Sequence, residues 1–197
     1  FVPDPWSQTN VSGPKSLEWV FEAVSQIVND NAKKSLKLRS ILNLLVGASL
    51  NAQRGSIFQL MKYVWATLKG KGWSRALLLD RLLADIFLTQ WNNTKPDFSS
   101  LFLNASAHIQ HHYLFSSLPY RGELRNPDWY LEAGVDPVLE SYELYDSIVG
   151  EILKLAKKND VRIMLLTGLR QLPNHEVTYY YRLKDHRRFL EKIHIFP

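Results

Sequence analysis

The sequence predicts an α/β protein, with a partial parallel β-sheet and crossover helices preceded by an all-helical insertion or cap. Three observations lead to this fold class. Apolar residues recur at helical spacing through the first half, two short continuous apolar runs follow in the second half, and helical segments separate those runs. We therefore expect an irregular leader over 1–15, a helical cap-like region over 16–94 and an α/β core segment over 95–197.

The composition is typical of a soluble globular domain. Apolar residues make up 46% of the 197 residues, which is enough to bury a core. The net charge of +5 comes from scattered basic residues, which argues against nucleic acid and gives slightly more weight to a small anionic ligand. The chain has no cysteine, so disulfides, thiolate metal sites and cysteine nucleophiles are excluded.

The first half is expected to be helical after a leader that holds three prolines and one glycine. An apolar stripe begins after Ser16, and further helices are expected at about 35–50, 56–68 and 74–92. The longest apolar stretch carries charges that recur on one side of a helix, so it predicts an amphipathic helix rather than a membrane span. These charges belong to Arg75, Asp80, Arg81 and Asp85. The chain starts at Phe1 without a methionine or a signal peptide, and we expect it to be a processed or excised piece of a longer protein; the compartment stays open.

The second half alternates between strand-like and helical patterns. The run FSSLFLN over 98–104 predicts a buried strand, followed by a helix over about 105–116. Helical periodicity resumes from Val138 to Leu155. VRIMLLTG over 161–168 predicts a second buried strand, and a short basic helix starts near Asp185.

A strand, helices and a second strand form a crossover unit, so the two strands should be parallel. The carboxyl ends of parallel strands lie at one edge of the sheet, where open α/β sheets bind ligands. The first strand ends at Asn104 and the second at Thr167. The sequence therefore predicts a polar site where the chain leaves these two residues.

The segment KPDFSSLFLNASAHIQHHY, the helix VLESYELYDSIVGEILKLA and the following strand resemble the core of the alkaline phosphatase superfamily, in particular its nucleotide pyrophosphatase/phosphodiesterase-like branch. The resemblance covers roughly residues 95–195, about half of the chain. It implies hydrolysis of phosphate or sulfate esters with two divalent metal ions, often zinc. It also implies that the helical first half is a cap, and that the nucleophile would lie upstream of Phe1.

The metal-ligand motifs of that family are degenerate in this chain. The Asp-x-x-x-His element maps onto Asn104 to His108, where an amide replaces the carboxylate, and the Asp-His pair maps onto Gly168 and Leu169. Divalent cations depend on carboxylate and imidazole ligands. The isolated piece is therefore expected to be inactive as a phosphate or sulfate ester hydrolase, and activity of a full-length parent stays open. The alternative is a non-catalytic anion-binding or protein-interaction module.

Three histidines occur within five positions on the helix expected after the first strand. On a helix His108 shares a face with His111 and His112, which suits a metal held by His108 and His112, or an anion at low pH. The alternative is one hydrogen-bonded core imidazole and two solvated ones.

The other candidate ligand-binding residues lie in the turns that follow the two expected strands. Asn104 could orient a ligand or cap the next helix. Thr167 and Arg170 could hold a phosphate or a carboxylate, although a surface arginine in a turn is the commoner outcome. The basic run from Arg182 to Arg188 suggests nucleic acid only superficially and is better explained as a solvated helix face. A small anionic ester is the expected substrate class, and the oligomeric state stays open.

Overall fold

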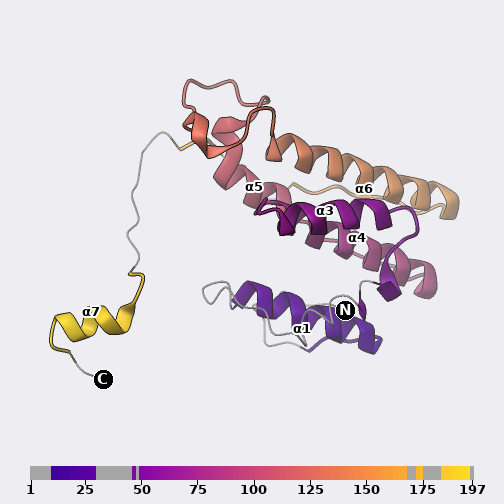
Figure 1. Cartoon of the computed structure of the whole chain (residues 1–197). Coiled ribbons are helices and arrows are strands. Elements are labelled where there is room, and N and C mark those ends of the chain that lie inside the picture. Colours follow the sequence, from indigo (N-terminus) through magenta and orange to yellow (C-terminus); the bar gives the residue numbers. More distant parts are fainter. Residues whose placement is uncertain (1–9, 30–45, 48, 168–171, 175–182, 196–197) are drawn as a thin grey trace. The chain divides into compact units, whose positions relative to one another are not determined.

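The structure is a computed structural model of the chain, and it describes residues 10–29, 46–47, 49–167, 172–174 and 183–195. The described residues fall into two units, 1–166 and 167–197, and each unit is considered by itself. Every regular element in the described part is a helix (Figure 1). The α-helices are α1 Lys15–Asn29, α3 Ile57–Leu68, α4 Ser74–Thr94, α5 Ala105–Tyr113, α6 Pro137–Asn159 and α7 His186–Lys192. Two short 3-10 helices complete them, η1 Leu114–Ser116 and η2 Asp128–Tyr130.

The predicted α/β fold is therefore wrong for the part of the chain that the structure describes. The segment 98–104 and residues 161–167 of the second expected strand are irregular, and no β-ladder forms among the described residues. Residue 168, the last of that expected strand, lies outside the described part.

The physical reason is that a strand needs a neighbour that satisfies its backbone. In the first segment, Leu101 and Leu103 pack against the helical core while Phe102 is exposed. In the second, Val161 donates its backbone N–H to Ala156 at the end of α6, and the side chains from 161 to 167 are all exposed. A continuous apolar run is compatible with a buried strand, but it does not supply the partner strand that the ladder requires.

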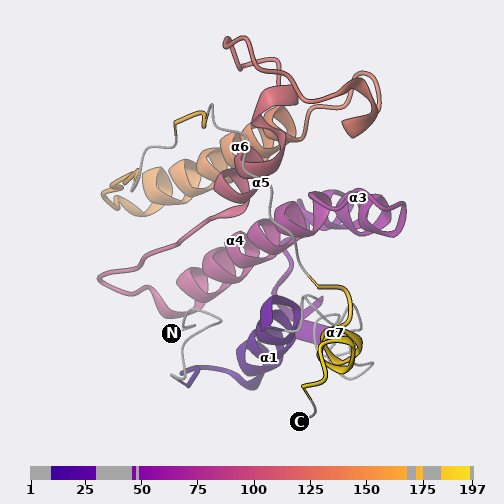
Figure 2. The same cartoon turned by 90° about the vertical axis from the view of Figure 1, so that its left-hand side faces the viewer.

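The core of the first unit lies between four helices, with α4 in contact with α3, α5 and α6 (Figure 2). Its fully packed side chains are Tyr63, Trp73, Leu77, Ala84, Ala105, Ile109, Val138, Leu144 and Ile148. Because α5 also packs on α6, each helix in this group buries an apolar face against at least one other helix.

A smaller apolar cluster joins α1 to the opposite part of α4. Leu17 and Val20 of α1 pack with Leu82 and Ile86 of α4. Residues 46–47 and 49–51 are helical, and a Cβ added at Gly47 would collide with the Val20 side chain of α1. A larger residue at this position would require the Val20 side chain or the adjoining backbone to move.

The helices α3 to α7 begin and end close to where the sequence predicts them. The predicted helices at 56–68 and 74–92 correspond to α3 and α4, and the short basic helix begins after Asp185, which caps it by accepting the Arg188 backbone N–H. Most of the helix expected at 35–50 lies outside the described residues. Among the helices that the structure describes, none combines the length and the apolar character that crossing a bilayer requires.

Candidate functional site

One helix presents a large apolar surface to solvent. In α3, the buried Tyr63 faces the core, and the opposite side of the helix carries large apolar side chains. The most exposed are Phe58 (84%), Met61 (65%), Trp65 (61%) and Leu68 (75%). We call these four residues the α3 seam. Exposed single apolar residues are ordinary, but a contiguous set on one helix face is typical of an interaction site.

The spacing of the α3 seam is that of a helix that pairs with another helix. Successive seam residues are three, four and three positions apart, which is the a and d pattern of the coiled-coil heptad. Ile57 and Val64, which are half exposed, flank the seam on one side. The seam thus offers the side chains that act as knobs in helix-to-helix packing.

The inner side of α3 is fixed to the rest of the bundle by polar contacts. Lys62 forms an ion pair with Glu140 of α6 at 3.1 Å, and Glu140 also accepts the indole N–H of Trp73 at 2.9 Å. Burial, and then the nearby Glu140 carboxylate, raise the pKa of Tyr63 to about 12. The phenol therefore stays neutral at physiological pH.

The turn that leads into α3 is fixed by a buried carboxylate of α4. Asp85 accepts hydrogen bonds from the Ser56 hydroxyl and from the backbone N–H of Gln53. It also pairs with Arg81 one turn earlier on α4, and Arg81 forms a bidentate pair with Glu151 of α6 at 2.8 and 2.9 Å. The side chains of Arg81 and Asp85 are both fully buried.

Burial and ion pairing shift the pKa values of this ion-pair cluster in opposite directions. Burial raises the pKa of Asp85, although the bonds from Ser56 and Arg81 oppose that shift. For Arg81, burial lowers the pKa, but Glu151 and Asp85 outweigh burial and the net shift is upward. The sequence predicts an amphipathic helix whose charges recur on one side, and that side turns out to be partly inside the bundle, because Asp80, Arg81 and Asp85 are buried.

A second buried carboxylate holds the start of α5. Asp80 accepts the backbone N–H groups of Asn104 at 3.0 Å and Ala105 at 2.7 Å, and the Tyr145 hydroxyl of α6 at 2.6 Å. A carboxylate at a helix start satisfies free N–H groups and complements the helix dipole. Burial raises the pKa of Asp80, and the hydrogen bond from Tyr145 opposes that shift.

Four of the residues predicted for the ligand site lie on α5 or at its start. Asn104 occupies the N-cap position of α5, but its side chain makes no capping bond, because Asp80 supplies the cap instead. His108, His111 and His112 lie on the exposed side of α5, and the rings of His108 and His112 are 5.1 Å apart between centroids in an edge-to-face contact. The two predicted metal ligands are therefore neighbours.

The surroundings of the His108 imidazole favour its neutral form. Burial lowers its pKa, and the neighbouring His112 and His111 add to that shift. A neutral imidazole is the form that binds metal. Within the described ranges, however, no three His, Asp or Glu side chains are grouped as a metal site requires. The assignment of His108 and His112 to a metal stays a prediction.

The second turn of the predicted site lies in the other unit or outside the described residues. Thr167 is exposed and irregular, and it begins the second unit, while Asn104 belongs to the first. Arg170, together with Gly168 and Leu169, lies outside the described residues. Since the sheet edge that was to align the two turns is absent from the described part, the geometric argument for one shared pocket no longer holds.

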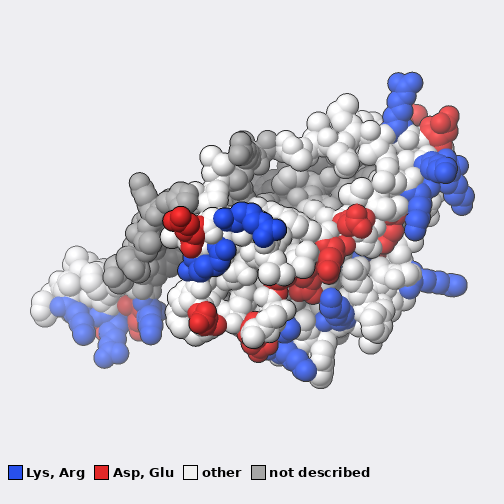
Figure 3. Space-filling model, turned by 90° about the horizontal axis from the view of Figure 1, so that it is seen from above, with Lys and Arg blue, Asp and Glu red and all other residues white. Residues whose placement is uncertain are grey.

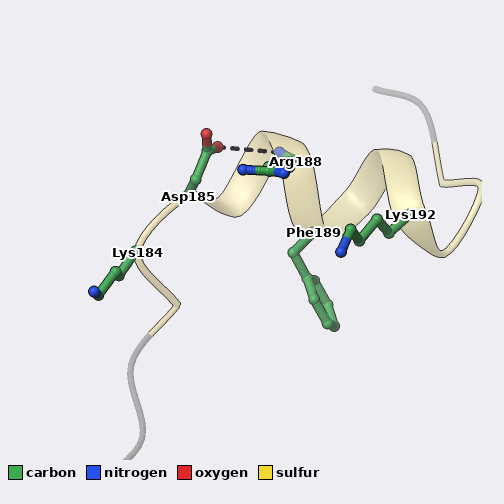
Figure 4. A pocket seen from close by; sticks show the side chains of 5 residues that line it. All are labelled: Lys184, Asp185, Arg188, Phe189 and Lys192. Atoms are coloured by element: carbon green, nitrogen blue, oxygen red, sulfur yellow. Dashed lines mark hydrogen bonds between the residues drawn. The ribbon is translucent and has the colours of Figure 1, made fainter.

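The second unit contains a shallow basic hollow on α7, with a volume of about 410 Å³ (Figure 4). Its lining is Lys184, Asp185, Arg188, Phe189 and Lys192. Figure 4 shows these side chains spreading outward instead of converging on one point. They are all exposed, in keeping with the solvated helix face that the sequence predicts for this basic run.

Comparison with known proteins gives no relative on which a function could rest. No family model, no curated protein and no solved structure matches the chain. The resemblance to the alkaline phosphatase superfamily therefore has no further support. The α/β description is wrong for the described part, which is helical, and the descriptions as alkaline-phosphatase-like, phosphodiesterase-like or as a hydrolase have no support in these comparisons.

Sequence reasoning missed the α3 seam, although the sequence holds a signal for it. The stretch from 57 to 68 is apolar on nearly every side, with Leu60 and Tyr63 on the inner faces in addition to the seam. One face suffices to attach a surface helix to its core. A second apolar face on the same short helix indicates a second contact.

Proposed function

We propose that this chain is a non-catalytic protein-interaction module, and that the α3 seam receives an amphipathic α-helix of a partner protein. The observation that supports the proposal is the exposed row of Phe58, Met61, Trp65 and Leu68 at heptad spacing. A partner helix with apolar a and d positions would place its own side chains between these four. Burial of aromatic and large aliphatic side chains is the main source of energy in such interfaces.

The chemistry around the seam favours a helix over a lipid surface. Helices that lie on anionic membranes present a large apolar face beneath a strongly cationic polar face. In α3 the side opposite the seam holds the buried Tyr63 and faces the carboxylate of Glu140, so the cationic charge is limited to Lys62 and Lys69 at the edge of the seam and does not form a strongly cationic face. Figure 3 shows acidic and basic side chains interspersed across the face of the first unit that is seen from above, without a large field of one sign.

The test is a binding titration with a defined probe. The probe is a fluorescent helical peptide of about 21 residues, with leucine at every a and d position and glutamine at every e and g position. We expect saturable binding to the full chain, followed by fluorescence anisotropy. Phe58→Ser and Trp65→Ser should each weaken binding by at least about tenfold, since large aromatic residues carry much of the binding energy in such interfaces.

Two matched control variants are available on the same chain. Phe98 is 85% exposed and Trp129 is 82% exposed, and neither belongs to α3. Phe98→Ser and Trp129→Ser should therefore leave the affinity unchanged. If the peptide does not bind, or if the seam variants bind as well as the controls, the proposal is wrong.

Two further measurements test whether a second copy of this chain or a lipid surface binds the α3 seam in place of a partner helix. Sedimentation equilibrium would reveal self-association that Phe58→Ser abolishes, which would assign the α3 seam to a second copy of this chain. Flotation with vesicles of phosphatidylserine and phosphatidylcholine would reveal lipid binding that depends on the seam. Either result in place of peptide binding would overturn the proposal.

A further inference from the structure

The charges that border the α3 seam all have the same sign. In the heptad that places Phe58 and Trp65 at a, the two e positions are Lys62 and Lys69. The helix from Ile57 to Leu68 contains no acidic residue. Charges at e and g positions select the partner of a helix and its orientation.

Of the two lysines at e positions, Lys69 has no ion-pair partner among the described residues. Lys62 is already paired with Glu140 at 3.1 Å, so its charge is partly compensated. Lys69 is exposed, and its ammonium group lies 5.1 Å from the Trp65 ring centroid, directly beside the seam. The cation–π contact fixes the lysine head group at the edge of the surface that a partner would cover.

Resting on the proposed function, we propose that the partner helix is acidic at the positions that flank its apolar seam, so that its carboxylates meet Lys69 and, more weakly, Lys62. A second copy of α3 would not meet this requirement. In an antiparallel pair of two α3 helices the e positions face one another, so lysine would oppose lysine. Like charges placed opposite one another at an interface disfavour binding.

The experiment uses three peptides with the same leucine seam and with glutamate, glutamine or lysine at the e and g positions. We expect the acidic peptide to bind the full chain about three- to tenfold more tightly than the neutral one, and the basic peptide to bind more weakly than the neutral one. The preference should shrink when the salt concentration rises from about 0.05 M to about 0.5 M, because the charges are exposed.

Charge reversal locates the effect. Lys69→Glu should invert the order, so that the basic peptide binds more tightly than the acidic one. Lys95→Glu is the matched control, because Lys95 also stacks on a tryptophan, at 4.3 Å from the Trp91 ring centroid, but lies at the end of α4. The control should keep the preference for the acidic peptide. Circular dichroism of each variant verifies that the helices are retained.

The outcomes separate this inference from the proposed function. Failure of the neutral peptide to bind the α3 seam would reject the interaction module itself. Binding of the neutral peptide with no gain for the acidic one, or an unchanged order in Lys69→Glu, would reject only the acidic partner.

Discussion

Helices α3 and α4 lie side by side and invert the usual distribution of side chains. Helix α4 buries Asp80, Arg81 and Asp85, whereas α3 exposes Phe58 and Trp65. Both arrangements carry a cost in isolation, because buried charge loses hydration and exposed apolar surface orders water. In α4 the cost is offset within the chain, since each buried charge has hydrogen-bond partners. In α3 no described residue covers the apolar side chains. Any burial of this apolar surface therefore has to come from outside this group of helices.

This contrast separates structural groups from functional ones. A satisfied buried charge is explained by the fold, and it needs no ligand. An unsatisfied apolar face is not explained by the fold, which is why the interaction site is assigned to α3 and not to the polar cluster in α4.

The largest effect is expected from loss of the central cation in α4. Arg81→Ala leaves Asp85 and Glu151 without their shared partner, and it should lower the free energy of unfolding by about 3–5 kcal/mol. Urea denaturation measures this change. Arg75→Ala, an exposed change on the same helix, should shift stability by no more than about 0.5 kcal/mol. Equal effects of the two variants would remove the distinction between α4 and an ordinary surface helix.

A smaller loss is expected at the start of α5. Asp80→Ala removes the acceptor for two backbone N–H groups and for the Tyr145 hydroxyl. Groups left buried without partners should cost about 1–3 kcal/mol, measured by the same denaturation. Asn104→Ala should be nearly neutral by comparison, since the Asn104 side chain makes no capping bond. A larger loss in Asn104→Ala than in Asp80→Ala would contradict the capping role given to Asp80.

The pH dependence of the free energy of unfolding tests how burial affects the Asp80 carboxyl group. Burial raises the pKa of Asp80 above its ordinary value of 3.8, so the folded chain binds the proton more readily than the unfolded one. The stability that this group contributes is therefore present in full below pH 3.8 and is lost as pH rises through the raised pKa. Subtracting the unfolding free energy of Asp80→Asn from that of the wild type at each pH isolates this contribution. The difference should fall with rising pH and then level off; a rising difference would mean that the pKa is lowered.

The smallest effect on stability is expected at the α3 seam. Phe58→Ser should change the free energy of unfolding by no more than about 0.5 kcal/mol, because the side chain is exposed in the folded chain. Tyr63→Ala, on the inner side of the same helix, should cost about 3–5 kcal/mol because it leaves a cavity in the core. Thermal denaturation of both variants compares the two faces. A large loss in Phe58→Ser would show that the fold itself needs the seam.

The sequence predicts the positions of the helices in this chain well. It predicts poorly which segments pack against one another. Helical spacing is a local signal, so α3 to α6 and the short α7 follow from it. The two apolar runs near Asn104 and Thr167 depend on non-local pairing, and a run such as VRIMLL does not reveal whether another strand lies beside it. Position along a helix likewise does not tell whether Arg81 faces solvent or a carboxylate on another helix. The α3 seam has a signal in the sequence, because one short helix carries apolar side chains on more faces than its attachment to the core requires.

The length of α3 limits the lifetime of a complex between the α3 seam and a partner helix. A helix of 12 residues extends for about 18 Å, so the seam engages only about two heptads of a visiting helix. Association at so short a contact is expected to be fast. Differences in affinity between partner helices would then lie mainly in their dissociation rates. A long-lived complex would then require several such contacts between the same two molecules, because a contact that dissociates can form again while the others remain bound.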